Sequence, residues 1–382
     1  MTLSRRKTLA LIGGGTLLAA TGAAGFAITR TPKDAVAPWA AAGQYTDPRK
    51  RALSYAILAP NPHNMQPWIV DLDTPDQATL YVDTDRLLPH TDPFSRQIVI
   101  GLGCFLELMA LSAAQDGYRV HFDLFPEGTE ADRLDRRPVA IARFVPDTSL
   151  AEPDLFDQIL HRRSVKEPYD TARPVSDEVL ATLRKSVRAT TGVETTNDTA
   201  RVAQLRDLTA NAFLKEFETP SAYRESVDLF RIGRREVNAN PDGLDFSGPM
   251  FEALHLTGLF TRKGSLDRAG YSYTSAVQMV QDTARTGMAY IWQVTATNTR
   301  NDQIAAGRDW VRLNLAATAL GLNVQPMSQA LQEYPEMAAR YDAVHLQLAP
   351  DGGTVQMLGR LGYGPSVGHS PRWPLEAKIR NG

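Results

Sequence analysis

The chain has almost no cysteine: Cys104 is the only one among its 382 residues. A single cysteine excludes an intramolecular disulfide, and its position in mid-sequence excludes a lipobox near the N-terminus. Cys104 lies in the apolar, helix-like run Gly103–Leu111, which favours a buried, inert thiol over a nucleophile. The protein must therefore fold through its hydrophobic core alone.

The chain also lacks an excess of charge of one sign. The formal net charge is -2, and no long run of Lys or Arg occurs beyond the N-terminus, so nothing favours nucleic-acid binding. The sequence shows no metal-ligand spacing and no credible Ser-His-Asp set. With 43% hydrophobic residues, the composition is that of a folded protein, and the length suggests about two domains.

The N-terminus carries a targeting segment. Arg5–Arg6 precede an uncharged stretch, Thr8–Thr29, that is rich in Gly and Ala, which is typical of a twin-arginine (Tat) signal. We therefore expect export to the periplasm or to the outer side of the inner membrane. A helix over this stretch would be roughly 33 Å long, so a plain membrane anchor stays open, as does cleavage. Residues 1–42 are set apart as signal or anchor.

The Ala59–Trp68 loop concentrates unusual residues. It holds three prolines and two asparagines, followed by Gln66 and Trp68. A rigid turn that presents amides beside an aromatic ring suits a planar ligand with donors and acceptors, such as a flavin or a nucleotide base. The alternative is a structural anchor that leads into a strand at Trp68–Leu72.

Hydrophobic periodicity predicts alternating groups of helices and strands. The segment 238–275 shows no clear period, and we predict an irregular stretch that serves as a lid. Helices are predicted over 47–58, 95–115, 153–162, 176–190, 199–217, 223–235 and 302–320, and strands over 68–72, 78–82, 118–125, 139–145, 289–296 and 355–363.

The two long apolar helices are similar to each other in sequence, which indicates an internal repeat. Six residues recur at a constant offset of 204, and both helices end at a glycine before a strand. Chance similarity is the alternative, but duplication into halves at 43–150 and 151–382 is favoured, and two such halves would mimic a homodimer. The recurring residues are Ile100, Gly103, Leu111, Ala113, Gly117 and Val120, which return as Ile304, Gly307, Leu315, Ala317, Gly321 and Val324.

A basic cluster follows at His161–Lys166. Two guanidiniums, a hydroxyl and an ammonium within six residues are the groups that bind phosphate. A solvated basic helix end is the alternative. A third segment, Ser370–Leu375, adds Arg372.

Together these segments resemble the nitroreductase family of FMN enzymes. Arg162-x-Ser164-x-Lys166 is similar to the family's phosphate motif, Ala59–Trp68 to its flavin loop, and Gly321–Gln329 to its late turn. The Arg-x-Ser motif here follows the loop instead of preceding it. With the repeat, this order resembles the Acg-like branch, in which two nitroreductase-type halves form a pseudo-dimer within one chain.

The resemblance implies an α+β fold with antiparallel-rich central sheets flanked by helices, and a single FMN, because no second Gln-Pro-Trp loop occurs. Arg162, Ser164 and Arg372 would hold the phosphate, and Lys166 would reach the ribityl chain or the N1/O2 edge. His63 is either an acid or a structural turn residue. The remaining implied ring contacts are Pro60, Asn61, His63, Asn64 and Gln66 from the loop, and Pro326, Met327 and Ser328 from the other half.

The implied function is that of an exported FMN-dependent oxidoreductase that passes hydride through flavin N5 to a small organic acceptor, without a catalytic side chain. Because NAD(P)H is not expected outside the cytoplasm, the donor would be a quinone or a redox protein. We expect a monomer. The alternatives are a protein that sequesters FMN beneath the lid, and an exported structural protein with a degenerate pocket.

Overall fold

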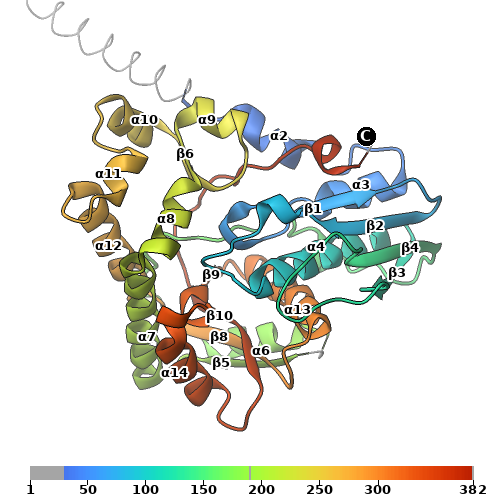
Figure 1. Ribbon diagram of the computed structural model, residues 1–382. Helices are drawn as coiled ribbons and strands as arrows, with labels where there is room; N and C mark the ends of the chain where they lie inside the picture. Colours follow the sequence, from blue (N-terminus) through green and yellow to red (C-terminus); the bar gives the residue numbers. More distant parts are fainter. Residues whose placement is uncertain (1–29, 189–190, 381–382) are drawn as a thin grey trace, which may run out of the picture.

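The computed structural model describes residues 30–188 and 191–380 (Figure 1). The predicted Tat signal or anchor, up to residue 29, lies outside the described residues. The described chain begins with α2 (Lys33–Ala41), which contributes the buried Trp39 to the core although the sequence analysis set residues 1–42 apart. α3 (Pro48–Ala56) follows, and the Asp47 carboxylate caps it by accepting a hydrogen bond from the Arg49 amide.

The first sheet is antiparallel and has four strands. β1 (Trp68–Asp71), β2 (Gln77–Val82), β3 (Tyr118–Leu124) and β4 (Ala140–Pro146) are arranged in the order β1-β2-β4-β3. Buried and partly exposed residues alternate along β2, as expected for a strand with one face on the core.

The second sheet repeats this plan. β5 (Gly192–Thr196), β8 (Ala289–Thr295), β9 (Asn323–Pro326) and β10 (Thr354–Gly362) are antiparallel in the order β5-β8-β10-β9. The first, second, fourth and third strands of each sheet thus occupy matching places. The α+β prediction is confirmed, and the shared strand order supports the duplication that the sequence indicated.

Two long helices, α4 (Arg96–Gln115) and α13 (Arg300–Ala319), cross between the sheets (Figure 1). A Cβ on Gly103 would lie 2.3 Å from the Ile304 carbonyl oxygen, and a Cβ on Gly307 would lie 1.9 Å from that of Ile100. Gly103 therefore meets Ile304, the repeat counterpart of Ile100, and Gly307, the counterpart of Gly103, meets Ile100 in the same way. This reciprocal contact is the one a two-fold symmetric dimer makes.

The halves differ most in the connection between their first two strands. A short turn at residues 72–76 joins β1 to β2, whereas residues 197–288, here called the insertion, join β5 to β8. The insertion contains α7 (Thr199–Glu218), α8 (Pro220–Asp228), β6 (Phe230–Ile232), α9 (Gly233–Ala239), β7 (Leu244–Phe246), α10 (Pro249–Leu256), α11 (Arg262–Leu266) and α12 (Tyr271–Ala284).

Two expectations for the insertion were wrong. The segment 238–275, predicted to be irregular, is built mainly of short helices. These helices pack on a separate aromatic cluster that includes Phe230, Phe246 and Phe260. The helix predicted over 223–235 ends at Asp228, where the chain enters the parallel β6–β7 pair. Short helices of one or two turns carry too little periodicity to be recognised.

Other boundaries also shifted. The helix predicted over 153–162 is the short α5 (Pro153–Phe156), followed by hydrogen-bonded turns up to His161. α6 (Asp177–Lys185) is shorter than predicted, and β5 and α14 (Ala338–Leu348) were missed. Within the described residues, α4 alone is long and apolar enough to cross a membrane, and it is a buried core helix. Short 3₁₀ helices occur at Pro62–Asn64, Thr84–Arg86, Ser328–Leu331, Pro335–Met337 and Leu375–Lys378.

Candidate functional site

The basic cluster is an extended segment that reaches the second sheet. Ser164 forms an isolated parallel bridge with Val324 of β9, so the cluster is not a solvated helix end. Side chains alternate along extended backbone, which places Arg162, Ser164 and Lys166 on one side. The bridge brings this segment beside Pro326–Ser328, where Met327 is buried and donates its amide to Leu358 at 2.8 Å.

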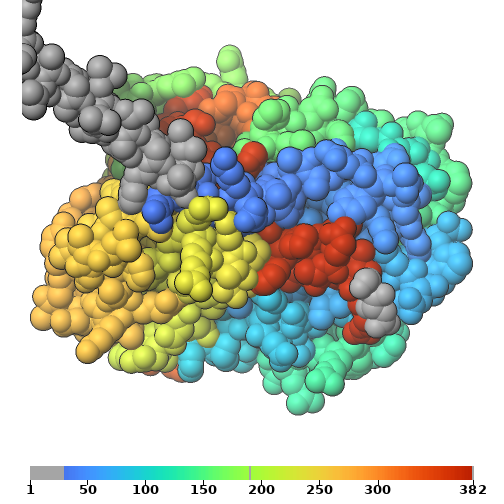
Figure 2. All heavy atoms as spheres, turned by 90° about the horizontal axis from the view of Figure 1, so that it is seen from above, coloured from blue at the N-terminus to red at the C-terminus, as the bar shows by residue number. Residues whose placement is uncertain are grey.

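Arg162 and Arg372 converge although they are far apart in sequence. Each guanidinium donates to the Leu58 carbonyl oxygen at 3.2 Å, at the end of α3, and each residue is only 3% exposed. Burial lowers the pKa of Arg162 to about 10. Burial, together with the charges of Arg162 and Arg163, lowers the pKa of Arg372 to about 9. In Figure 2 the red C-terminal segment runs beside the dark-blue N-terminal part of the described chain and meets the yellow part of the insertion at one end.

These cations have no carboxylate partner. Among the ion pairs of the described residues, none involves Arg162, Arg163 or Arg372. The buried Nε of Arg372 has no hydrogen-bond acceptor, and Arg163 lies over the Trp39 ring at 5.1 Å. Buried charges without a counter-ion are costly, so this cluster is suited to an anion. Bidentate guanidiniums and the Ser164 and Ser370 hydroxyls fit a phosphate.

The Ala59–Trp68 loop is tightly constrained. His63, Asn64 and Gln66 have left-handed φ angles of 47°, 54° and 52°, which are uncommon outside glycine. Side-chain hydrogen bonds compensate: the Asn61 Oδ1 accepts from the Gln66 amide at 2.8 Å, and the Asn61 Nδ2 donates to Ala59 at 3.1 Å. Strain held by such contacts is typical of binding loops.

Two loop amides are engaged within the protein. The Asn64 Oδ1 accepts from Arg372 at 2.6 Å and so orients that guanidinium. Gln66 is fully buried, donates to the Pro241 carbonyl at 2.7 Å and accepts from the Trp373 amide at 2.9 Å. Gln66 therefore joins the loop to the insertion and to the C-terminal segment. Ring contacts by Asn61, Asn64 and Gln66, like those predicted for Pro60 and His63, stay predictions.

Lys166 and His63 belong to a polar cluster beside the insertion, here called the recess, that also contains Glu216, Ser226 and Asp245. Desolvation lowers the pKa of the Lys166 ammonium, and the charges of Asp245 and Glu216 act in the opposite direction. Burial and the charge of Lys166 lower the pKa of His63 to about 4, so its imidazole is neutral at pH 7. Its Nδ1 is buried without a hydrogen-bond partner.

The insertion supplies acidic and hydroxyl groups to this recess that no sequence signal indicated. The Ser226 Oγ lies 3.4 Å from both the His63 Nε2 and the Glu216 Oε1. Burial raises the pKa of Glu216 to about 6, although Gln332 donates to its Oε2 at 2.8 Å. Asp245 is close enough to Lys166 for their charges to interact, and burial raises its pKa. No periodicity or motif placed α7, α8 and β7 beside the loop.

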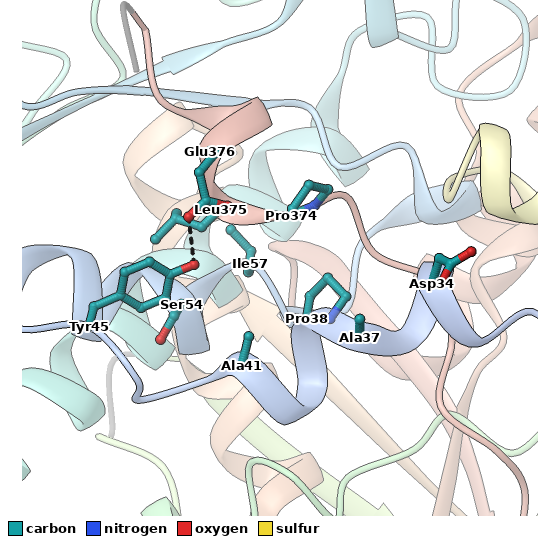
Figure 3. A pocket seen from close by; sticks show the side chains of 10 residues that line it. All are labelled: Asp34, Ala37, Pro38, Ala41, Tyr45, Ser54, Ile57, Pro374, Leu375 and Glu376. Carbon is teal, nitrogen blue, oxygen red and sulfur yellow. Dashed lines mark hydrogen bonds between the residues drawn. The ribbon is translucent and has the colours of Figure 1, made fainter.

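Two separate cavities lie away from this recess. One, of about 150 Å³, opens between α2, α3 and the C-terminal segment, where Tyr45 donates to Glu376 at 2.9 Å (Figure 3). The other, of about 260 Å³, adjoins Arg163 and Val165, the side of the basic segment opposite Lys166. Among the described residues, no group of three or more His, Cys, Asp or Glu could hold a metal ion.

The fold and site define a class: a two-halved α+β protein in which two buried guanidiniums, those of Arg162 and Arg372, meet without a carboxylate partner among the described residues. No protein-family model matches the chain. It is 26% identical over 329 residues to "Putative NAD(P)H nitroreductase Rv3131" of Mycobacterium tuberculosis, covering 83% of this chain and 85% of that one. It is 30% identical over 187 residues to "Putative NAD(P)H nitroreductase acg" of the same species, covering 48% and 51%. The resemblance to nitroreductase-type proteins, acg among them, is confirmed.

Solved structures with nitroreductase names are more distant. The FMN-dependent nitroreductase NfnB from Mycobacterium smegmatis, in complex with NADPH, is 16% identical with a TM-score of 0.37, covering 59% of this chain and 97% of that one. A protein from Anabaena variabilis, described as a putative nitroreductase, is 14% identical with the same TM-score, covering 76% and 69%.

Proposed function

We propose that the protein is an exported, FMN-dependent oxidoreductase of nitroreductase type. The observation that carries this proposal is the meeting of Arg162 and Arg372, two buried guanidiniums with no carboxylate partner in the described part of the chain. They fit the phosphate of a flavin mononucleotide, and the sequence relatives named as nitroreductases agree with that ligand.

Each residue then has a distinct task. Arg162, Ser164 and Arg372 bind the phosphate, and Asn64 orients Arg372. Lys166 places a positive charge at the ring edge, where it would stabilise the anionic reduced form. The constrained loop and Pro326–Ser328 border the ring. FMN, when bound, supplies hydride transfer, so no protein nucleophile is required.

Export, donor and assembly complete the proposal. The Arg5–Arg6 pair and the uncharged Thr8–Thr29 stretch direct the protein through the Tat translocase to the outer side of the inner membrane. NAD(P)H is not expected there, so a quinone or a redox protein donates the electrons and a small organic molecule accepts them. The chain acts as a monomer, because its two halves supply the pairing that a dimer would otherwise provide.

A second candidate is an FMN-sequestering protein with little turnover. It is favoured by the way the insertion is fixed over the site: Gln66 binds the Pro241 carbonyl, and the Asp242 carboxylate accepts from Trp373 at 2.8 Å and from Arg86 at 2.7 Å. A cover held by buried hydrogen bonds and an ion pair would open seldom.

The visible spectrum of the purified protein is the first test. We expect oxidised-flavin bands that are released as FMN on denaturation, and a colourless protein that does not take up added FMN would refute the proposal. Reduction with dithionite, followed by reoxidation with a water-soluble benzoquinone or with nitrofurazone, then separates the two candidates. Reoxidation over many cycles supports an oxidoreductase.

A matched variant sharpens the test of the cover. Replacing residues 249–275 by a short Gly-Ser linker keeps the Pro241 and Asp242 contacts but removes the outer helices of the insertion. If the flavin stays bound in this variant and still resists reduction and reoxidation, the oxidoreductase proposal fails and sequestration is supported.

A further inference from the structure

Exposed apolar side chains gather on the outside of the insertion. Of the nine large hydrophobic side chains that are exposed among the described residues, five fall within one stretch of thirty residues; these are Met250, Leu256, Leu259, Tyr271 and Met279, here called the outer face. Scattered exposed apolar residues are ordinary, but such a concentration marks an interaction surface.

The helix α10 shows that this exposure is organised. Met250, Ala253 and Leu256 follow each other at three-residue spacing and point outwards, while the charged Glu252 is buried. A surface helix of a soluble domain normally has the opposite arrangement. The Ser272 Oγ donates to the Leu259 carbonyl at 2.9 Å, which brings the end of α10 beside Tyr271 at the start of α12.

The chain enters the fold beside this helix. Arg30, the first described residue, forms an ion pair of 3.2 Å with Glu252 of α10. The Asn238 Nδ2 at the end of α9 donates to Asp34 of α2 at 3.0 Å. The described chain therefore begins next to the outer face, directly after the uncharged stretch Thr8–Thr29 of the sequence. Figures 1 and 2 show α9 and α10 beside α2 at one end of the molecule.

The charges around the outer face are mostly basic. Between residues 233 and 279 the exposed basic residues are Arg234, Arg235, Lys263 and Arg268, whereas the exposed acidic ones are Asp245, in the recess, and Asp267. Apolar side chains bordered by Lys and Arg are the pattern of a surface that lies on anionic lipid headgroups.

We propose that the outer face rests on an anionic lipid bilayer, the same bilayer that holds the Thr8–Thr29 stretch. Burial of Met250, Leu256, Leu259 and Tyr271 among the headgroups and basic contacts with lipid phosphates stabilise this orientation. An N-terminal segment tied to α10 by the Arg30–Glu252 ion pair leaves the insertion little freedom to turn away from the membrane.

The orientation has a consequence for the recess, and this consequence rests on the proposed function. The insertion forms both the outer face and the cover of Lys166 and His63. A bilayer under the insertion would therefore lie against the segment that covers Lys166 and His63, so a lipophilic carrier such as a quinone could approach that segment without crossing water.

The test uses the full chain in vesicles of phosphatidylcholine with phosphatidylglycerol. Leu259→Cys is labelled with an environment-sensitive NBD probe, and Leu346→Cys, an exposed leucine on α14 in the second half, is the matched control. Cys104 does not interfere, because it is 1% exposed and burial raises the pKa of its thiol to about 12. Both substituted leucines are exposed, so the fold is retained.

We expect brominated lipid to quench the probe at position 259 and to leave the probe at position 346 unchanged. Arg235→Glu combined with Lys263→Glu should remove the quenching at 259 while the protein stays with the vesicles through its N-terminus. Equal quenching at both positions, or none at either, would overturn the proposal. So would a probe at 259 that is already shielded without lipid, since a second copy or the N-terminal segment would then cover the face.

The flavin spectrum, measured on the same samples, keeps this result separate from the proposed function. A colourless protein with quenching at 259 would refute FMN binding and leave the membrane orientation intact. A flavin-containing protein without quenching would do the reverse.

Discussion

Two arginine clusters in this molecule differ in how their charge is balanced. At the crossing of the long helices, the fully buried Glu107 accepts from Arg188, Arg308 and Arg312 at 2.7–2.9 Å, and Arg312 also pairs with Glu152. At the end of α3, Arg162 and Arg372 share only a carbonyl oxygen. The first cluster is neutralised by carboxylates of the described chain, whereas no carboxylate of the described residues pairs with the two cations of the second.

The pKa shifts separate the clusters in the same way. Burial acts to raise the pKa of Glu107, but Arg308, Arg188 and Arg312 outweigh it and lower the pKa. Burial lowers the pKa of Arg162 and of Arg372, and no acid reverses the effect. The first cluster is thus compensated within the described chain, whereas the charge of Arg162 and Arg372 is left uncompensated there.

The largest expected effect is on the balanced cluster. Glu107→Gln leaves three arginines without their shared carboxylate, and we expect a loss of about 3–5 kcal/mol in the free energy of unfolding, measured with urea. The exposed Glu336→Gln is the control and should change little. Because the pKa of Glu107 is lowered, its contribution is present above the ordinary carboxyl pKa and is lost as the pH falls through the folded value. A loss that does not shrink at all as the pH is lowered from neutral towards acid unfolding would contradict this assignment.

A somewhat smaller loss is expected where the two helices touch. Gly307→Ala puts a Cβ 1.9 Å from the Ile100 carbonyl oxygen, so the helices must separate and draw Arg308 and Arg312 away from Glu107. We expect a loss of about 1–3 kcal/mol, in spite of the higher helix propensity of alanine. Gly368→Ala, which meets no atom within 4 Å, is the control. An unchanged thermal midpoint for Gly307→Ala would show that the crossing is not close-packed.

The unbalanced cluster should respond in the opposite way. Arg162→Met removes one of two repelling cations and a single hydrogen bond, so the FMN-free protein should unfold at the same urea concentration or a higher one. FMN affinity should fall by about tenfold to a hundredfold, because a charge-assisted bond to phosphate contributes about 1.5–3 kcal/mol. Arg312→Met is the matched comparison and should destabilise the protein without this specific loss of FMN. Unchanged FMN affinity in Arg162→Met would remove Arg162 from the phosphate site.

The smallest effect concerns Glu216, a buried carboxyl next to His63, Lys166 and Glu225. Because burial raises the folded pKa of Glu216 to about 6, its favourable contribution is complete below the unfolded pKa and disappears as the pH rises through 6. We therefore expect Glu216→Gln to be about 2 kcal/mol more stable than the wild type at pH 8, with no difference near pH 4. Urea titrations at both pH values check this, and a variant destabilised at pH 8 would show that Glu216 is held as a paired anion.

Much of this fold could be predicted because its central elements are long and periodic. The two long core helices and the central strands of the second sheet, β8 and β10, could be predicted from their apolar patterns. The offset of 204 residues indicated the helix pair that meets at Gly103 and Gly307. β5 was missed because Gly192–Thr196 is short and only partly buried. α14 was missed because it has just two buried side chains, Val344 and Leu348.

Only part of the candidate site could be predicted from the sequence. The phosphate-binding end could be predicted because Arg162, Ser164 and Lys166 form a local motif with the period of an extended chain. The recess could not be predicted, because Glu216 and Ser226 come close to His63 only through the tertiary fold of the insertion. A hydrogen bond between residues 163 positions apart leaves no trace in local periodicity. The internal engagement of Gln66 was likewise set by tertiary contacts with Pro241 and Trp373.

The reciprocal glycine contact also determines how the protein responds when its concentration falls. In a two-subunit protein, an interface of this kind dissociates once the protein concentration falls below its dissociation constant. Here α4 and α13 belong to one polypeptide, so they re-form their contact at a rate that is independent of concentration. The unfolding midpoint should therefore be the same at nanomolar and micromolar protein. A chain that leaves a crowded cytoplasm for a dilute compartment would keep its site intact without finding a second copy.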